Sequence, residues 1–266
     1  MIELQYSSFS SVEGLFKQKK QFIPAFAVIH GSYPGRVFVD HENSPKVAIV
    51  WAIGRWMYLE GNIATNQEKS ELKRFFREIV MPDCKKRSRN WFEIYTNDSK
   101  QLEEYFLKEI DFLKVDKHYE SVYTLNVEKF LQVAKRSKRN EVKVEFRNFD
   151  IIPESLEETS YVKNSTLSKK TVGVVIKRGN TILSIAKNNG FTFGKEYFID
   201  IDTFKEEKRK KGYATLAAIK IISYFLEKNM FPLWETTESN IPSQKLALKL
   251  GFEPMERYPV FEFRLK

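Results

Sequence analysis

The sequence predicts an α/β protein with mixed sheets flanked by helices (α+β mixed sheet), organised as two domains. Its 266 residues exceed what one modest domain usually holds. Short β-rich runs followed by amphipathic segments occur in both halves of the chain. An apolar content of 42% is enough to fill packed cores. We expect a smaller N-terminal α/β domain over 1–126, a linking helix over 127–140 and a second domain with a central mixed sheet flanked by helices over 141–266.

The first domain is expected to open with strands. Residues 22–30 and 36–40 are β-rich runs, and the turn-forming residues 31–35 separate them. Residues 46–51 and 56–60 predict a hairpin that turns near a glycine.

Helices and strands then alternate. Residues 66–81 predict a helix, because apolar residues such as Leu72 and Phe75 recur at spacings of three and four, with charges opposite. The rest of the domain is expected to follow as strand 90–96, helix 99–110 and strand 119–125. A helix over 127–138 ends in lysine and arginine, which is typical of a helix C-terminus and indicates the domain border.

The sequence of the second domain predicts a sheet built around a strand–helix–strand unit. Residues 178–180, Arg-Gly-Asn, join two β-rich runs as a tight turn. The helix after the central strand has Leu216, Ile219 and Ile222 on one face. The expected order is strand 142–146, helix or loop 153–163, hairpin 171–177 and 181–187, strand 197–203, helix 212–226, strand 231–236, helix 243–250 and strand 260–265.

The net charge of +9 and the pI near 9.3 favour an anionic partner without choosing its kind. The basic clusters at 85–89, 135–139 and 205–211 are separate in the sequence. A nucleic-acid-binding protein usually has its basic and aromatic residues together along one face. We therefore expect no nucleic-acid partner.

The chain carries few signals for a membrane, an export route or a metal. No apolar run approaches the ~18 residues of a membrane span, and the N-terminus lacks the pattern of a secretion signal. The single cysteine, Cys84, cannot form an internal disulfide. Three scattered histidines do not suggest a zinc site. We expect a cytoplasmic protein without a metal or a membrane partner.

Residues 209–215, Arg-Lys-Lys-Gly-Tyr-Ala-Thr, are the most informative stretch. They lie between a β-branched, strand-like segment and a helical one. The unpaired amides and the dipole of a helix start attract anions, and Gly212 and Ala214 leave room for a bulky anion. A diphosphate site is one interpretation, and a solvated basic turn capped by glycine is the other.

The spacing Arg-x-x-Gly-x-Ala resembles the acyl-CoA pyrophosphate loop of GNAT acetyltransferases. Trp234, then Asn-Ile-Pro-Ser at 240–243 and Lys-Leu-Gly-Phe at 249–252, follow in the order typical of that family. The Ile-Asp-Ile-Asp-Thr strand at 199–203 is similar to a Gram-positive bacterial subfamily that includes zwittermicin-resistance-type acetyltransferases. The resemblance covers the whole chain, strongly in the last hundred residues.

This resemblance implies an acetyl-CoA-dependent N-acetyltransferase that modifies an amine of a small-molecule or peptide acceptor, as a monomer or homodimer. The strand before the loop would splay from the next one, so that its free backbone groups bind pantetheine and one N–H polarises the thioester carbonyl. For Asn240 an ordinary helix N-cap is the alternative. The implied cofactor-binding residues are Ile201, Asp202, Thr203, Phe204, Arg209, Lys210, Lys211, Gly212, Tyr213, Ala214, Thr215, Asn240 and Ser243.

Acetyl transfer to an ammonium with a pKa near ~10 needs a base, directly or through water. Asp200 is the first candidate, because it lies on the strand that leads into the loop and matches an acidic position of the subfamily. Alternation with period two places Phe198, Asp200 and Asp202 on one face of that strand. The alternative is that this face is merely solvated.

The chain departs from the family pattern at the general acid. Many GNAT enzymes carry a tyrosine where this chain has Ala247. Either Tyr258 or Tyr213 protonates the leaving thiolate, or no dedicated acid is used. A non-catalytic, acyl-CoA-binding sensor or interaction protein of the same fold is therefore the alternative function.

The N-terminal half has no equivalent of the loop motif, and no residue-level repeat links the two halves. A degenerate GNAT-like module without cofactor and a plain α/β lid both fit this half.

Overall fold

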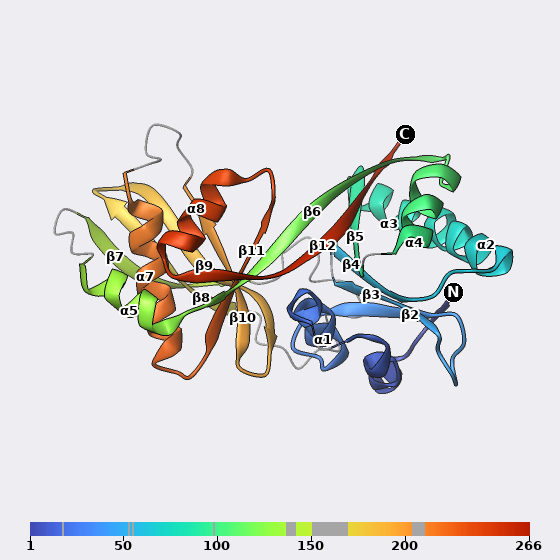
Figure 1. Ribbon diagram of the computed structural model, residues 1–266, viewed down its shortest axis with the longest axis horizontal. Coiled ribbons are helices and arrows are strands. Elements are labelled where there is room, and N and C mark those ends of the chain that lie inside the picture. Colours follow the sequence, from blue (N-terminus) through green and yellow to red (C-terminus); the bar gives the residue numbers. More distant parts are fainter. Residues whose placement is uncertain are drawn as a thin grey trace. The chain divides into compact units, whose positions relative to one another are not determined.

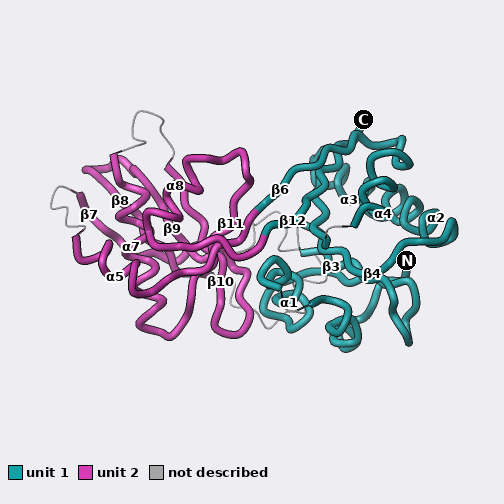
Figure 2. Tube along the Cα trace, viewed as in Figure 1, with its two compact units in different colours: residues 1–120, 159–165, 257–266 teal, residues 121–158, 166–256 magenta. Residues whose placement is uncertain are grey.

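The structure is a computed structural model that describes residues 1–17, 19–52, 54, 56–97, 99–136, 142–150, 170–203 and 211–266. The chain divides into two compact units, which Figure 2 colours separately. Of the described residues, unit 1 holds 1–120 and 257–266, and unit 2 holds 121–150 and 170–256. The C-terminal strand β12 (Phe252–Leu265) therefore begins in unit 2 and ends in unit 1.

Unit 1 is a mixed sheet in the order β1-β2-β3-β4-β5-β12. Neighbouring strands are antiparallel except β4 and β5, which are parallel. Its elements are β1 (Ile2–Glu3), η1 (Tyr6–Leu15), η2 (Lys20–Phe22), α1 (Ile23–Ile29), β2 (Gly35–Val39), β3 (Val47–Ala52), β4 (Trp56–Gly61), α2 (Asn66–Phe75), η3 (Phe76–Val80), α3 (Met81–Lys86), β5 (Trp91–Thr96), α4 (Lys100–Glu104), η4 (Tyr105–Glu109) and the first part of β6 (Leu113–Leu125).

The strand predicted over 22–30 is wrong, because this segment forms η2 and α1. Every residue of α1 is buried, so the run is apolar on all sides and carries no period that separates a helix from a strand. Pro24 stands at the start of the helix, where proline is tolerated because its missing N–H would have no intrahelical partner.

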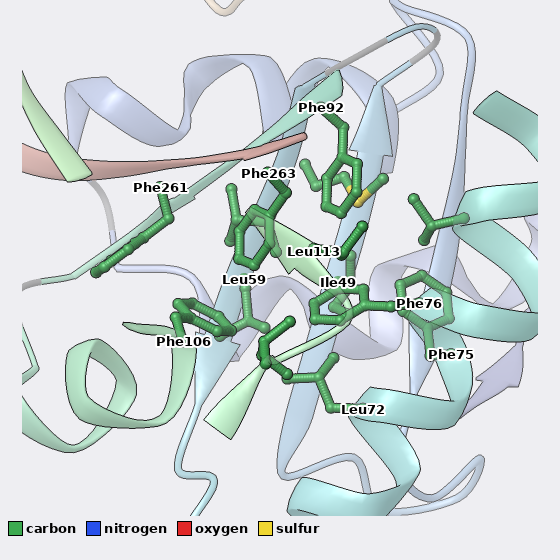
Figure 3. Close-up of a cluster of buried hydrophobic side chains, with 14 of the residues drawn as sticks. Ile49, Leu59, Leu72, Phe75, Phe76, Phe92, Phe106, Leu113, Phe261 and Phe263 are labelled. Atoms are coloured by element: carbon green, nitrogen blue, oxygen red, sulfur yellow. The ribbon is translucent and has the colours of Figure 1, made fainter. Parts of the chain in front are cut away.

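The core of unit 1 is rich in phenylalanine (Figure 3). Phe92 of β5 stacks on Phe263 of β12 with ring centroids 4.9 Å apart. Phe106 meets both Phe261 and Phe263 edge to face, at 5.0 and 5.1 Å. Aromatic pairs at these separations add to the free energy of burial. The last strand of the chain is thus part of the N-terminal unit's core.

Unit 2 is a mixed sheet in the order β6-β11-β10-β9-β8-β7 (Figure 1). β7, β8, β9 and β10 pair antiparallel in that order. β10 and β11 are parallel, and the crossover helix α7 connects them. Besides the ends of β6 and β12, its elements are α5 (Val127–Arg136), β7 (Lys143–Asp150), β8 (Lys170–Arg178), β9 (Thr181–Phe193), β10 (Glu196–Asp202), α7 (Tyr213–Leu226), β11 (Phe231–Thr237) and α8 (Ile241–Lys249).

One face of the unit 2 sheet carries the core, which α5, α7 and α8 complete. Tyr197 and Ile199 of β10 and Trp234 of β11 lie in this core with the apolar face of α7. The helix that the sequence places as a link corresponds to α5, whose Phe130 is fully buried in the same core. Phe198, Asp200 and Asp202 alternate onto the opposite face of β10.

Both units share one order of elements. Three antiparallel strands (β2–β4 or β8–β10) lead into a helix and then into a strand parallel to the third. The predicted α/β class, with mixed sheets flanked by helices, is confirmed. Within the described part of the chain, no helix combines the length and the apolar character needed to span a lipid bilayer.

Tyr197 gives a test of the unit 2 core. Its hydroxyl is buried without a hydrogen-bond partner among the described residues, and its ring lies 4.4 Å from that of Phe225. An unpaired buried hydroxyl costs free energy, whereas the ring contact does not need it. We expect Tyr197→Phe to raise the free energy of unfolding by about 1 kcal/mol, measured by urea denaturation. A clear loss of stability would mean that the hydroxyl has a partner, such as a buried water.

Candidate functional site

The central feature of unit 2 is an early end to the pairing between β10 and β11. Their ladder joins only Glu196 to Phe231, Tyr197 to Pro232 and Phe198 to Leu233. β10 nevertheless continues to Asp202 and stays paired with β9 as far as Asp202 and Ile185. The residues of β10 from 199 to 202 therefore present one backbone edge that β11 does not occupy. We call this edge the open edge of β10.

A bulge in β9 lies opposite the point where the open edge begins. The register shifts between Tyr197 and Ile199, so that three residues of β9, 189–191, oppose Phe198 alone. Asn188 and Asn189 accept hydrogen bonds from the backbone amides two residues later, at 2.8 and 3.0 Å. Bulges bend the strand and increase its twist. The divergence of β10 from β11 thus has a local cause in β9.

Helix α7 begins after the same end of β10. Gly212 is its N-cap, with φ 77° and ψ 12°, a left-handed conformation that glycine adopts without steric cost. Among the described residues no side chain caps this helix end, and the first intrahelical bond runs from the Leu216 amide to the Gly212 carbonyl at 3.1 Å. Helix starts without a side-chain cap favour anions. The exposed Lys211 adds a formal positive charge beside it.

Asp200 lies on the open edge of β10, on the face away from the unit 2 core. Its carboxylate is 3.8 Å from the Lys187 ammonium, in an ion pair with both side chains partly exposed. The two residues are direct partners across β9 and β10. The register and alternation place Glu235 of β11 on the same face, across the divergence. Sequence reasoning missed Glu235, because only the pairing of Phe198 with Leu233 aligns it with Asp200.

Asn240 and Ser243 form the N-terminus of α8. The Asn240 side chain is the N-cap and accepts the Ser243 amide at 3.2 Å. The Ser243 hydroxyl accepts the indole N–H of the buried Trp234 at 2.9 Å. These bonds couple α8 to β11 on the far side of the divergence. The N-cap alternative for Asn240 is therefore present in the structure.

Tyr258 lies in the part of β12 that belongs to unit 1. Its ring is buried, with its centroid 6.2 Å from that of Tyr95. Of the expected cofactor residues, Phe204, Arg209 and Lys210 fall outside the described residues. The others lie at the end of β10 or at the starts of α7 and α8: Ile201, Asp202, Thr203, Lys211, Gly212, Tyr213, Ala214, Thr215, Asn240 and Ser243.

Unit 1 closes the corresponding position between its strands. The parallel ladder of β4 and β5 continues through Leu59 and Thr96. Immediately beyond it, the Asn97 side chain and amide donate to the two carboxylate oxygens of Glu60 at 2.6 and 3.2 Å. Burial raises the pKa of Glu60, which these hydrogen bonds partly oppose. No divergence comparable to that of β10 and β11 occurs among these described strand residues.

Unit 1 also caps its helix with its own side chains. Thr65 accepts the Glu68 amide, and the Glu68 carboxylate accepts the amides of Ala64 and Thr65, both at 2.8 Å. This reciprocal arrangement is a capping box. The pKa of Glu68 is lowered, chiefly by the hydrogen bond from the Thr65 amide. A carboxylate thus already occupies the anion-binding end of α2. In the described part of the chain, no group of three or more His, Cys, Asp or Glu side chains could hold a metal.

The chain is similar in sequence to known proteins. The GNAT acetyltransferase family matches residues 13–261. The protein called "Uncharacterized N-acetyltransferase YdfB" of Bacillus subtilis (strain 168) is 23% identical over 265 residues, 97% of each chain.

Solved structures with the same fold cover the whole chain. A GCN5-related N-acetyltransferase-like protein from Streptococcus suis 89/1591 has a TM-score of 0.64 and 19% identity, over 97% of this chain and 99% of that one. A tandem GNAT protein from the clavulanic acid biosynthesis pathway has a TM-score of 0.61 and 10% identity, over 100% and 98%. Because the family match spans most of the sequence, the chain belongs to the GNAT acetyltransferase family and is an N-acetyltransferase.

Proposed function

We propose that the protein transfers an acetyl group from acetyl-CoA to an amine, and that unit 2 holds the acetyl-CoA. The observation that carries this proposal is the coincidence of two features at one end of the sheet. The open edge of β10 starts after Phe198, and α7, with Gly212 as its N-cap, has no side-chain cap from the described residues. An elongated ligand with amides along its arm and phosphates at one end is complementary to both features.

The open edge fits the pantetheine arm. Residues 199–202 span about 13 Å at the usual rise of a strand, which is long enough for several hydrogen bonds to an extended ligand. An amide of this edge is suited to polarise the thioester carbonyl. When bound, acetyl-CoA supplies an acyl group activated as a thioester. In the proposal, Ile201, Asp202 and Thr203 line the arm, and those backbone groups of this stretch that point away from β9 bind it.

The start of α7 fits the pyrophosphate. The amides of Gly212, Ala214 and Thr215 belong to the N-terminal turn, and Lys211 adds charge. Tyr213 packs in the unit 2 core and fixes the first turn of the helix. Arg209, Lys210 and Phe204 keep the cofactor-binding role that the family pattern gives them.

Asp200 is the proposed general base. It lies on the open edge, on the face away from the packed core, and its carboxylate can accept a proton from an acceptor ammonium directly or through water. Lys187 is its ion-pair partner, 3.8 Å away. Tyr258 is the proposed general acid for the departing thiolate. Asn240 and Ser243 hold the start of α8 beside the arm, through the cap and through Trp234.

Unit 1 is proposed to be a degenerate GNAT-like domain that holds no acyl-CoA. Its strands stay paired, Glu60 and Asn97 join their ends, and Glu68 occupies the end of α2. The acceptor is a small-molecule or peptide amine, and the Ile-Asp-Ile-Asp-Thr strand favours the subfamily of zwittermicin-resistance-type enzymes.

Replacing Ala214 tests the anion site with a matched pair of variants. A glutamate in the first turn is compatible with the helix dipole, so the fold should persist while its carboxylate repels the pyrophosphate. We expect Ala214→Glu to weaken acetyl-CoA binding roughly tenfold or more relative to Ala214→Gln, measured by calorimetric titration. Equal affinities of the two variants would remove the α7 start from the proposal.

The same titration tests the closure of unit 1. We expect a stoichiometry of about one acetyl-CoA per chain, because a capping box already satisfies the start of α2 in unit 1, whereas no described side chain caps the start of α7 in unit 2. Glu68→Ala, which removes the capping carboxylate of unit 1, should leave both the stoichiometry and the affinity unchanged. Two sites in the wild type would contradict the closed state of unit 1.

Replacing Asp200 tests the base. We expect Asp200→Asn to lower kcat roughly 10²- to 10³-fold with little change in the Kd for acetyl-CoA. The decline in rate at low pH that protonation of a carboxylate base causes should also disappear. Asp202→Asn, on the same face two residues later, is the matched control. If Glu235→Gln rather than Asp200→Asn abolishes the low-pH decline, the base is on β11.

Replacing Tyr258 tests the acid. Tyr258→Phe removes only the hydroxyl and should lower kcat by roughly 10²-fold if the phenol protonates the thiolate. Affinity for acetyl-CoA should be retained. The ring packs against Tyr95, so a thermal melt of the variant checks that the core of unit 1 is intact. An unchanged kcat would show that the reaction uses no dedicated acid at this position.

A further inference from the structure

Ser184 of β9 makes side-chain hydrogen bonds at the end of the open edge of β10. Its hydroxyl donates to the carbonyl oxygen of Asp202 at 2.7 Å. The hydroxyl of Thr203, the first residue after β10, lies 3.2 Å from the Ser184 hydroxyl. Ser184 is fully buried, with an exposed fraction of 0%. A buried hydroxyl costs free energy unless it is paired, so these two contacts account for its presence there.

Counting donors fixes the direction of both bonds. A serine hydroxyl carries one hydrogen, and the Asp202 carbonyl can only accept. The Ser184 hydrogen is therefore used on Asp202, and Thr203 must donate to Ser184. The result is a relay from Thr203 through Ser184 to Asp202, which fixes the rotamer of Thr203 and the peptide after Asp202.

The position of this relay matters because no second described strand pairs with β10 there. Among the described residues, β10 pairs with both β9 and β11 before the divergence, but with β9 alone after Phe198. Strand ends with fewer hydrogen bonds open more readily than doubly paired segments. The last regular pair joins Asp202 to Ile185, and Ser184 adds a tether just beyond it.

We propose that Ser184 is a positioning residue for acetyl transfer: it holds the Asp202–Thr203 backbone against β9, so that the open edge is preformed when acyl-CoA binds. This inference rests on the proposed function of unit 2. Without the tether, ordering of the strand end is an added cost of binding. Ser184 itself is fully buried and acts through Asp202 and Thr203.

Two measurements on Ser184→Ala test the proposal. In the protein without acetyl-CoA, hydrogen exchange of the backbone amides at 201–203 should become roughly tenfold faster, while amides of α7 keep their protection. The Kd and the KM for acetyl-CoA should rise roughly fivefold to twentyfold with kcat nearly constant, since only preformation is lost. Ser184→Thr, which keeps the hydroxyl, should restore most of the affinity.

Ser223→Ala, which makes the same chemical change on α7, is the matched control and should leave exchange at 201–203 and affinity unchanged. Thr203→Val keeps the hydrogen bond from Ser184 to Asp202 and removes only the Thr203 hydroxyl donor. It should therefore cause a smaller increase in hydrogen exchange at 201–203. It replaces Ser184→Ala in the test if that variant does not fold. Unchanged exchange and an unchanged Kd in Ser184→Ala, or in Thr203→Val where that variant substitutes for it, would overturn the proposal. A wild type that binds no acetyl-CoA would instead overturn the proposed function, and the exchange data would still report on the tether.

Discussion

The loss of β11 as a neighbour of β10 after Phe198 is the constraint on which the site depends. A buried parallel sheet normally satisfies both edges of an internal strand, because unpaired backbone groups are costly. β10 gives up four residues of that pairing. Local hydrogen bonds order the segments that flank the opening, in the asparagine-supported bulge of β9 on one side and in the cap of α8, joined to Trp234, on the other. The opening is therefore built by its flanking strands and is not a consequence of the order of elements.

Unit 1 shows that the order of elements is not sufficient. It has the same three antiparallel strands, crossover helix and parallel strand. At the corresponding end of its sheet, however, side chains of the unit itself bind the groups that a ligand would need. Glu60 and Asn97 extend the contact between strands, and the Thr65–Glu68 capping box satisfies the helix start. Both are self-complementary, since each donor has an acceptor within the unit. A ligand would have to displace these bonds before it gained any of its own.

Sequence reasoning succeeded where the signal is local. The glycine at position 212, the period of α7 and the alternation of β10 all describe short segments, and each matches the element found. It failed over 22–30, where an evenly apolar run gives no period and a buried helix looks like a buried strand. The bulge of β9 and the alignment of Glu235 with Asp200 depend on register between strands, which no single segment encodes. A module of similar topology in the N-terminal half was only one of two interpretations, because the two halves carry different residues and share no repeat.

Two long strands, β6 and β12, explain why domain limits are hard to read from this chain. β6 and β12 are 13 and 14 residues long, and each passes from one unit to the other. Phe261 and Phe263 from the end of the chain stack in the core of unit 1, and Tyr123 lies in the core of unit 2. A fragment that ended at residue 126 would lack both phenylalanines and would leave Phe92 without its stacking partner. Because burial of such rings is a large part of a core's stability, each unit depends on a strand from the other half of the sequence.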